Sequence, residues 1–250
     1  PDVQEYNEHL IILSSPWMEG RLPGTRGMDL AREYVEREFI QTGLIGPVVD
    51  EATGERGYRQ DFDLGGSTEF VDQTLAIGDQ MTFTQGTDYE MTGLGGDASL
   101  SAPLSFVGYS IAQGPDDYSS YVEDDDLTGR IAVMLRFEPM DEDGNSLWRQ
   151  GTGWSARSTF SEKFGALAER NPAGVILVNP PGVNDRRAGE LMTDASRVMN
   201  GIPVFMATPD AAERMLAAGG DDRSIMDWRR LADSGEGGVV DIDGPMITME

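Results

Sequence analysis

Two stretches decide what fold this sequence can adopt: Leu104-Ser-Phe-Val-Gly-Tyr-Ser-Ile111 and Leu127-Thr-Gly-Arg-Ile-Ala-Val-Met-Leu-Arg-Phe137. Residues 104–111 and 131–137 are rich in β-branched and aromatic side chains, which favour strands. An acidic span with Asp116-Asp-Tyr118 separates them, and Gly129 closes the loop before the second run. The pattern predicts two strands on either side of a polar excursion, within a β-rich core.

Downstream of this pair, helix and strand signals alternate. Thr159-x-x-Glu162 has the spacing of a capping box and opens a predicted helix. The apolar runs 174–178 and 202–207 predict fully buried strands, and a further helix follows the second run. Residues 238–250 alternate between apolar and polar side chains and predict a pair of strands. The fold class is therefore mixed α and β.

Upstream, the pattern is helical first and β-like afterwards. Residues 3–13 and 28–42 carry apolar side chains at helical spacing, and we expect the apolar face of the second helix to be exposed or covered by a partner. Residues 45–57 are predicted to be loop. Three runs after this loop are each predicted to form a short strand: Tyr58–Leu64, Phe70–Ile77 and Met81–Phe83.

The chain is strongly acidic, with a formal net charge of −25 from 44 Asp and Glu against 19 Lys and Arg. A surface this negative repels phosphate backbones, so we expect no nucleic-acid partner. Lys163 is the only lysine, so arginine supplies nearly all of the positive charge. Salty surroundings, which screen self-repulsion, and a GC-rich genome are two explanations of this composition that stay open.

Composition also bears on compartment and on covalent chemistry. The absence of cysteine excludes disulfides, thiolate zinc ligands and cysteine nucleophiles. No apolar run approaches the roughly 20 residues that cross a bilayer, so we expect no membrane span. The first residues, Pro1-Asp-Val-Gln4, lack the features of a signal peptide. We nevertheless expect a periplasmic or secreted protein whose signal lies outside these residues.

Metal-ligating residues are sparse. His9, the only histidine, is expected to pack rather than to bind metal, because no second His or Cys completes a site. Carboxylates at 124–126 and 141–145 are oxygen ligands of the kind that calcium prefers. However, Thr152 stands where the second of these loops would need a bidentate glutamate, so solvated acidic loops are the favoured interpretation.

Trp148 and Trp154 are the two candidate contacts for a ligand or partner, because both lie in a polar loop. The alternative, which we favour, is that they plug the end of the β-core. No residue is assigned a catalytic role. A carboxylate-based hydrolase needs only two acidic side chains, but surplus Asp and Glu follow from the overall acidity and make that interpretation weak.

Two sets of motifs carry a resemblance to a known family. Glu19-Gly-Arg-Leu-Pro-Gly-Thr-Arg-Gly27, followed by a helix that ends at Thr42-Gly-Leu44, resembles the opening segment of peptidase family M28, the zinc aminopeptidases. Phe106-Val-Gly-Tyr-Ser-Ile111, Leu127-Thr-Gly-Arg-Ile131 and Glu138-Pro139 resemble the start of the protease-associated (PA) domain found in those peptidases.

The resemblance implies a division of the chain. Residues 1–45 would be an N-terminal helical segment that packs on a catalytic domain, and 46–102 would be connecting strands and loops. Residues 103–235 would form the PA domain, a β-sandwich or open barrel with flanking helices. Residues 236–250 would be strands that lead to the catalytic domain.

The resemblance also implies where the chemistry lies. Family M28 uses two zinc ions held by histidines and carboxylates, with a glutamate as general base. One histidine cannot supply that set, so we expect the catalytic zinc domain to be missing from this chain. These 250 residues are then expected to bind no cofactor and to be inactive alone.

The expected function is that of an accessory region of a metallopeptidase, which shapes substrate access or mediates protein contacts. Its partners would be the parent's own catalytic domain and peptide or protein substrates. The alternative is a non-enzymatic PA module of a receptor or surface protein that binds peptide or carbohydrate.

Overall fold

The computed structural model describes residues 2–50, 53–60, 73–193, 199, 201–236 and 238–250, and the chain divides into two units, 1–67 and 68–250. The elements of unit 1 are α1 (Val3–Leu13), the 3-10 helix η1 (Pro16–Arg21), α2 (Arg26–Gln41), β1 (Val48–Val49) and β2 (Arg56–Gly57).

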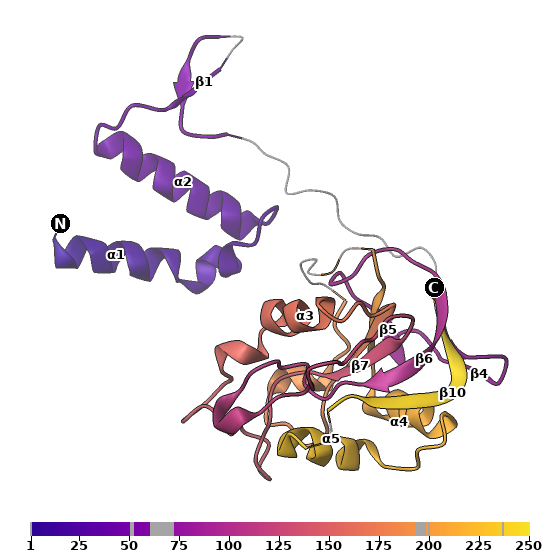
Figure 1. Ribbon diagram of the computed structural model, residues 1–250. Coiled ribbons are helices and arrows are strands. Elements are labelled where there is room, and N and C mark those ends of the chain that lie inside the picture. Colours follow the sequence, from indigo (N-terminus) through magenta and orange to yellow (C-terminus); the bar gives the residue numbers. More distant parts are fainter. Residues whose placement is uncertain (1, 51–52, 61–72, 194–198, 200, 237) are drawn as a thin grey trace. The chain divides into compact units, whose positions relative to one another are not determined.

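Unit 2 carries the remaining elements (Figure 1). They are β3 (Leu75–Ile77), β4 (Met81–Thr82), β5 (Tyr89–Met91), β6 (Leu100–Phe106), η2 (Pro115–Asp117), β7 (Ile131–Leu135), η3 (Ala156–Ser158), α3 (Phe160–Ala168), β8 (Gly174–Val178), η4 (Arg186–Gly189), β9 (Val204–Ala207), α4 (Pro209–Ala218), α5 (Ile225–Ser234) and β10 (Val240–Met249).

A tight turn in η1 positions the two helices of unit 1. Glu19, Gly20 and Arg21 all have positive φ, so the chain reverses within three residues. A Cβ at Gly27 would lie 2.1 Å from the carbonyl oxygen of Met18. Only glycine therefore lets the first turn of α2 rest on η1.

The core of unit 1 is small. In its described part only Met18, Ala31 and Tyr34 form a buried apolar cluster. The exposed apolar face expected on the second helix is confirmed at Phe39, which is 41% exposed, but not at Ala31, which is buried. The other large apolar side chains of unit 1 that are exposed are Val3, Tyr6, Leu10, Ile11, Ile12, Trp17, Leu22, Ile40, Leu44, Ile45 and Val49.

A single eight-stranded sheet, in the order β4-β3-β10-β6-β7-β8-β9-β5, forms unit 2. The pairs β6–β7, β7–β8 and β8–β9 are parallel, and the remaining pairs are antiparallel. The prediction of a strand pair at 238–250 is wrong. Instead one strand, β10, pairs with β6 on one side and with β3 on the other, with a register shift between Ile242 and Ile247.

The sheet is curled into a half-barrel, so its two ends approach each other. Tyr89 in the edge strand β5 donates its hydroxyl hydrogen to the Gln73 carbonyl at 2.9 Å, and the Met91 N–H donates to Gln73 Oε1 at 2.8 Å. Gln73 lies just before β3, near the opposite edge. The expected mixed α/β class is confirmed, and the sheet has the open-barrel form rather than that of two stacked sheets.

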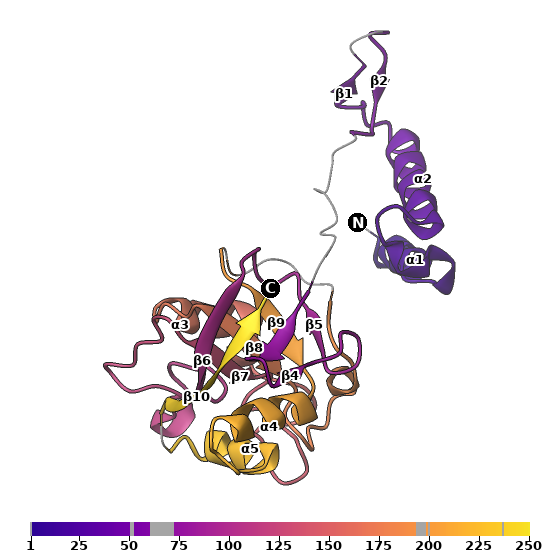
Figure 2. The same ribbon diagram turned by 90° about the vertical axis from the view of Figure 1, so that its right-hand side faces the viewer.

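Helices cover both faces of this sheet (Figures 1 and 2). Leu135 and Val178 on one face belong to the core cluster that Trp228 of α5 and Met215 of α4 complete. On the other face, side chains such as Leu177 pack against α3 in a second cluster. The parallel strands β7, β8 and β9 are fully buried, as strands covered on both faces must be.

Several predicted elements differ from the observed ones in their bounds. The run 104–111 contains the end of β6, which stops at Phe106, because positive φ at Gly108 and Ser110 turns the chain away. The predicted loop 45–57 contains the hairpin of β1 and β2. Residues 58–60 of the run Tyr58–Leu64 are not in a strand, and 61–64 and 70–72 lie outside the described residues.

The strands of the sheet come from three of the expected segments. β3 to β5 lie within 46–102, β10 lies within 236–250, and both groups join the strands of 103–235. The functional division at those boundaries stays a prediction. None of the described helices has the length and hydropathy needed to cross a membrane.

Close packing at the β10 register shift gives a first prediction. A Cβ at Gly244 would lie 2.1 Å from the Cα of Gly219, where α4 ends. Gly244→Ala should therefore lower the free energy of unfolding by about 1–3 kcal/mol, measured by urea denaturation.

The matched control is Gly165→Ala in α3, where an added Cβ meets nothing within 4 Å. That change should leave stability unchanged or raise it by up to about 1 kcal/mol. Equal effects of the two substitutions would contradict the packing argument.

Candidate functional site

The parallel strands end at a cluster of loops that is the natural place for a site. In open α/β sheets, ligands bind outside the carboxyl ends of the parallel strands. Here β7 and β8 end side by side, with Leu135 paired to Val178, and are followed by residues 136–158 and 179–190. We call these two segments the loop cluster.

A buried carboxylate holds the first of these segments in shape. Glu138 is fully buried, and its carboxylate accepts hydrogen bonds from the Ser146 hydroxyl at 2.5 Å and from the Ser155 N–H at 2.8 Å. The Ser155 hydroxyl donates to the other carboxylate oxygen. One side chain therefore joins the two ends of this loop, since Glu138 and Ser155 are 17 residues apart in the sequence.

The only lysine of the chain lies beneath this loop. Lys163 in α3 is fully buried, and its ammonium group donates to the carbonyl oxygens of Leu135 at 2.7 Å and of Phe137 at 2.6 Å. It also lies 5.4 Å from the ring of Tyr109. Burial lowers the pKa of Lys163 well below its ordinary value, and the charge of Glu138 opposes part of that shift.

The two predicted contact residues, Trp148 and Trp154, are both half-buried against the unit 2 core. Trp148 meets the ring of Tyr118 edge-on, with 5.0 Å between the centroids. Trp154 lies 4.6 Å from the Phe137 ring and donates its indole N–H to Asp185 Oδ2 at 2.7 Å. The structure places them where the core-plug interpretation expects them, and a role in ligand contact stays a prediction.

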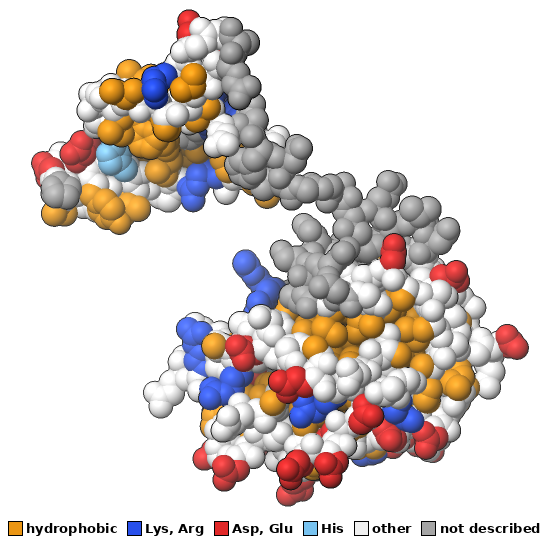
Figure 3. Space-filling view, turned by 45° about the horizontal axis from the view of Figure 1, so that its top comes forward, with side chains coloured by type: hydrophobic (Ala, Val, Ile, Leu, Met, Phe, Trp, Pro, Cys, Tyr) orange, Lys and Arg blue, Asp and Glu red, His pale blue; other side chains and the backbone are white. Residues whose placement is uncertain are grey.

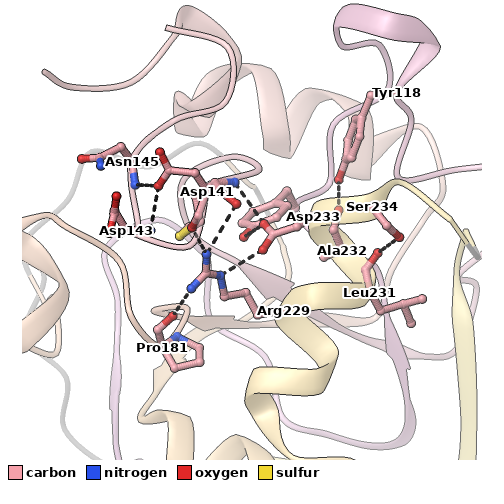
Figure 4. A network of polar contacts seen from close by, with 12 residues as sticks. Tyr118, Asp141, Asp143, Asn145, Pro181, Arg229, Leu231, Ala232, Asp233 and Ser234 are labelled. Carbon is pink, nitrogen blue, oxygen red and sulfur yellow. Dashed lines mark hydrogen bonds and ion pairs between the residues drawn. The ribbon is translucent and has the colours of Figure 1, made fainter. Parts of the chain in front are cut away.

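A second network, shown in Figure 4, joins α5 to both segments of the loop cluster. Arg229 donates from Nη1 to the Pro181 carbonyl at 3.0 Å and from Nη2 to the Asp141 carbonyl at 2.6 Å. Its Nε donates to Asp233 Oδ2, also at 3.0 Å. A single guanidinium thus holds the loops after β7 and β8 at a fixed separation.

Asp233 completes that network from the same helix. Its Oδ1 accepts from the Tyr109 hydroxyl at 2.8 Å and from the Met140 N–H at 3.1 Å. Burial raises the pKa of Asp233, although the hydrogen bonds from Tyr109 and Met140 and the charge of Arg229 oppose the shift. The pKa of Tyr109 is also raised, first by burial and then by the Asp233 charge.

These contacts decide what the arrangement can do chemically. Glu138 and Asp233 each have both carboxylate oxygens engaged by protein donors, so neither is placed to accept a proton from a substrate. The two networks fix the shape of the loop cluster.

The sequence interpretation missed the residues of both networks. The signal for Lys163 was present, because it falls among the apolar side chains of its own predicted helix. The signal for α5 was the capping box formed by Ser224 and Asp227, whereas Thr159, where such a box was expected, makes no side-chain cap. Glu138 was noticed only as part of the Glu138-Pro139 motif, and its buried contacts were missed because its partners lie in loops.

Several of the residues considered for metal are held by protein partners. His9 Nδ1 lies 2.6 Å from the Tyr34 hydroxyl, which links α1 to α2. Asp141 Oδ1 accepts from the N–H groups of Asp143 and Asn145, as in a tight turn. The described residues contain no group of three or more His, Cys, Asp or Glu that could hold a metal ion.

Comparison with known proteins gives a structural similarity. No protein-family model matches the chain, and no curated protein matches it. Among solved structures, the chain is similar to an aminopeptidase from Aneurinibacillus sp. strain AM-1, with a TM-score of 0.42 and 17% sequence identity. The similarity covers 98% of this chain and 42% of that chain, so this chain spans about two fifths of the length of that aminopeptidase.

The Arg229 network gives a prediction with a neighbouring control. Arg229→Met leaves the buried Asp233 carboxylate without its cation, so the free energy of unfolding should fall by about 3 kcal/mol in a denaturant titration. Arg230→Met removes an exposed ion pair with Asp227 and should change it by less than about 1 kcal/mol. A similar loss in both variants would speak against the network's role.

Buried Lys163 gives a pH-dependent prediction. Because its folded-state pKa is depressed, the unfolded chain binds one more proton than the folded chain between the two pKa values. Stability from this group therefore rises with pH. The unfolding free energy of the native chain minus that of Lys163→Met should therefore rise from pH 7 to pH 9.5, measured by urea denaturation at several pH values. A constant difference would mean that burial leaves the pKa near its ordinary value.

Proposed function

We propose that this chain is the non-catalytic N-terminal and PA region of a family M28 zinc aminopeptidase. In this proposal the region shapes substrate access to a catalytic domain outside these residues, or mediates protein contacts for it. The parent would act on peptides or proteins and bind two zinc ions. A periplasmic or secreted location is part of the same proposal.

The observation that carries the proposal is the apolar surface of unit 1. Its buried cluster has three members, too few to offset the conformational entropy of about 60 ordered residues. Leu10, Met28, Val35 and Phe39 meanwhile line an apolar groove of about 560 Å³ between α1 and α2. Figure 3 shows apolar side chains over much of the visible surface of this unit. A partner domain that covers this surface would supply the missing burial.

The geometry of the Glu19–Gly27 motif agrees with this interpretation. Its glycines allow the reversal in η1 and the close approach of α2 to Met18, which together fix the angle between the helices. The motif is thus explained by packing. No ligand is needed to explain its glycines, so the motif is consistent with a structural element that docks on another domain.

The residues of this chain do not fit a zinc pair. Zinc sites in proteins use His, Cys and carboxylates in groups of three or four. The chain has one histidine and no cysteine, and His9 is engaged by Tyr34. No step of peptide hydrolysis is therefore assigned to any residue here.

Enzymatic assay tests the proposal. The 250-residue chain, incubated with zinc and an aminoacyl-nitroanilide, should release no nitroaniline. The same chain extended by the codons that follow in its gene should show activity that a chelator removes and zinc restores. Turnover by the 250 residues alone, or an inactive extended protein that is folded and loaded with zinc, would refute the proposal.

A variant pair tests the role of unit 1 in the extended protein. Phe39→Asp places a charge on the apolar surface of α2 and should reduce the yield of active enzyme at least severalfold. Glu33→Gln, also exposed on α2, should leave that yield unchanged. Equal yields from the two variants would mean that this surface is not covered by the catalytic domain.

A further inference from the structure

Two buried polar side chains lie next to each other just after the carboxyl ends of β7 and β8. The register pairs Leu135 with Val178, so Arg136 and Asn179 are the next residues of adjacent parallel strands. They are 9% and 5% exposed, respectively. This is the position at which α/β sheets present side chains to ligands.

Both side chains converge on the same turn. Arg136 Nη1 donates to the Arg187 carbonyl at 3.2 Å, and Asn179 Nδ2 donates to the carbonyl of the next residue, Ala188, at 2.9 Å. The side chains of Arg136 and Asn179 therefore lie beside each other under η4. The Arg187 side chain, 53% exposed, rises from that turn into solvent.

The charge at this point is not balanced. Arg136 has no carboxylate within ion-pair distance in the described part of the chain, although it is buried. Its guanidinium lies 5.1 Å from the Phe137 ring, and the Arg187 guanidinium lies 5.3 Å from the same ring. Burial lowers the pKa of Arg136, and the nearby charge of Arg187 lowers it further.

The one carboxylate close by is already engaged. Asp185 accepts from Arg187 Nε at 2.8 Å and Nη2 at 2.6 Å, and from the Trp154 indole N–H. It therefore neutralises one guanidinium and leaves the other without a counter-ion. In a chain of net charge −25, a buried and unpaired arginine at a strand end is unusual and indicates a place for an anion.

Asn179 adds a second requirement. Its Oδ1 is buried and has no hydrogen-bond partner in the described structure, while its Nδ2 is held by Ala188. A buried acceptor without a donor is destabilising, because it has lost its hydrogen bond to water and gained none in the protein. The site therefore lacks an anion for Arg136 and an N–H or O–H donor for Asn179.

We propose that Arg136, Arg187 and Asn179 form a binding site for the free C-terminal carboxylate of a peptide. Arg136 supplies the charge for the carboxylate, and Arg187 donates to it from Nη1, which Asp185 leaves free. Asn179 Oδ1 accepts a peptide N–H beside it. The half-buried ring of Trp154 forms the wall. This inference does not depend on the peptidase proposal.

Titration of the whole chain at low salt tests the site. Acetyl-alanyl-alanine with a free carboxylate should bind. Binding is measured by calorimetry and by the change in tryptophan fluorescence. Its C-terminal amide should bind at least tenfold more weakly, because it lacks the charge. No binding of the acid, or equal binding of acid and amide, would overturn the proposal. So would tighter binding of inorganic phosphate than of the peptide acid.

Variants distinguish a built site from a general attraction of positive charge. Arg187→Gln, an exposed change, should weaken binding of the acid at least tenfold, and Arg136→Gln should do the same. Arg157→Gln removes the same charge from an exposed position of the loop cluster, where Arg157 donates to the Gln113 carbonyl, and should change affinity less than twofold. If Arg136→Gln fails to fold, Arg187→Gln decides the result. Equal losses in Arg157→Gln and Arg187→Gln would overturn the proposal.

Discussion

A strand with parallel neighbours on both sides must be covered on both faces, and unit 2 is built around this constraint. The ladder β6 to β9 places fully buried residues on two surfaces, so one helix, α3, packs on one face and two helices, α4 and α5, pack on the other. The helices in turn reach over the ends of the strands. Lys163 of α3 and Arg229 of α5 both bind loop carbonyls there.

Burial of charge is the second consequence of that coverage. Lys163, Arg229 and Asp233 are brought into the protein by the helices that cover the sheet, and Glu138 by the loop after β7; each is bonded to protein groups. Arg136 is buried at the same edge, where its Nη1 donates to the Arg187 carbonyl.

Unit 1 differs from unit 2 in how little apolar surface it buries. Its helices meet through a glycine-dependent turn and a three-residue cluster, while most of its large apolar side chains remain exposed. The stability of unit 2 rests on its own core. Unit 1 by itself buries a cluster of only three residues in its described part, and in the proposal above a partner domain covers its exposed apolar side chains.

Hydrophobic period and glycine position are local properties, so the mixed α/β class, helices close to 3–13 and 28–42, and strands within 131–137 and 174–178 could be predicted from the sequence. The position of β10 between β3 and β6, and of Arg136 beside Asn179, could be seen only in the folded chain. The same is true of the bonds from Glu138 to two serines far along the chain. Those contacts depend on strand order and loop closure, which join residues with no shared local pattern.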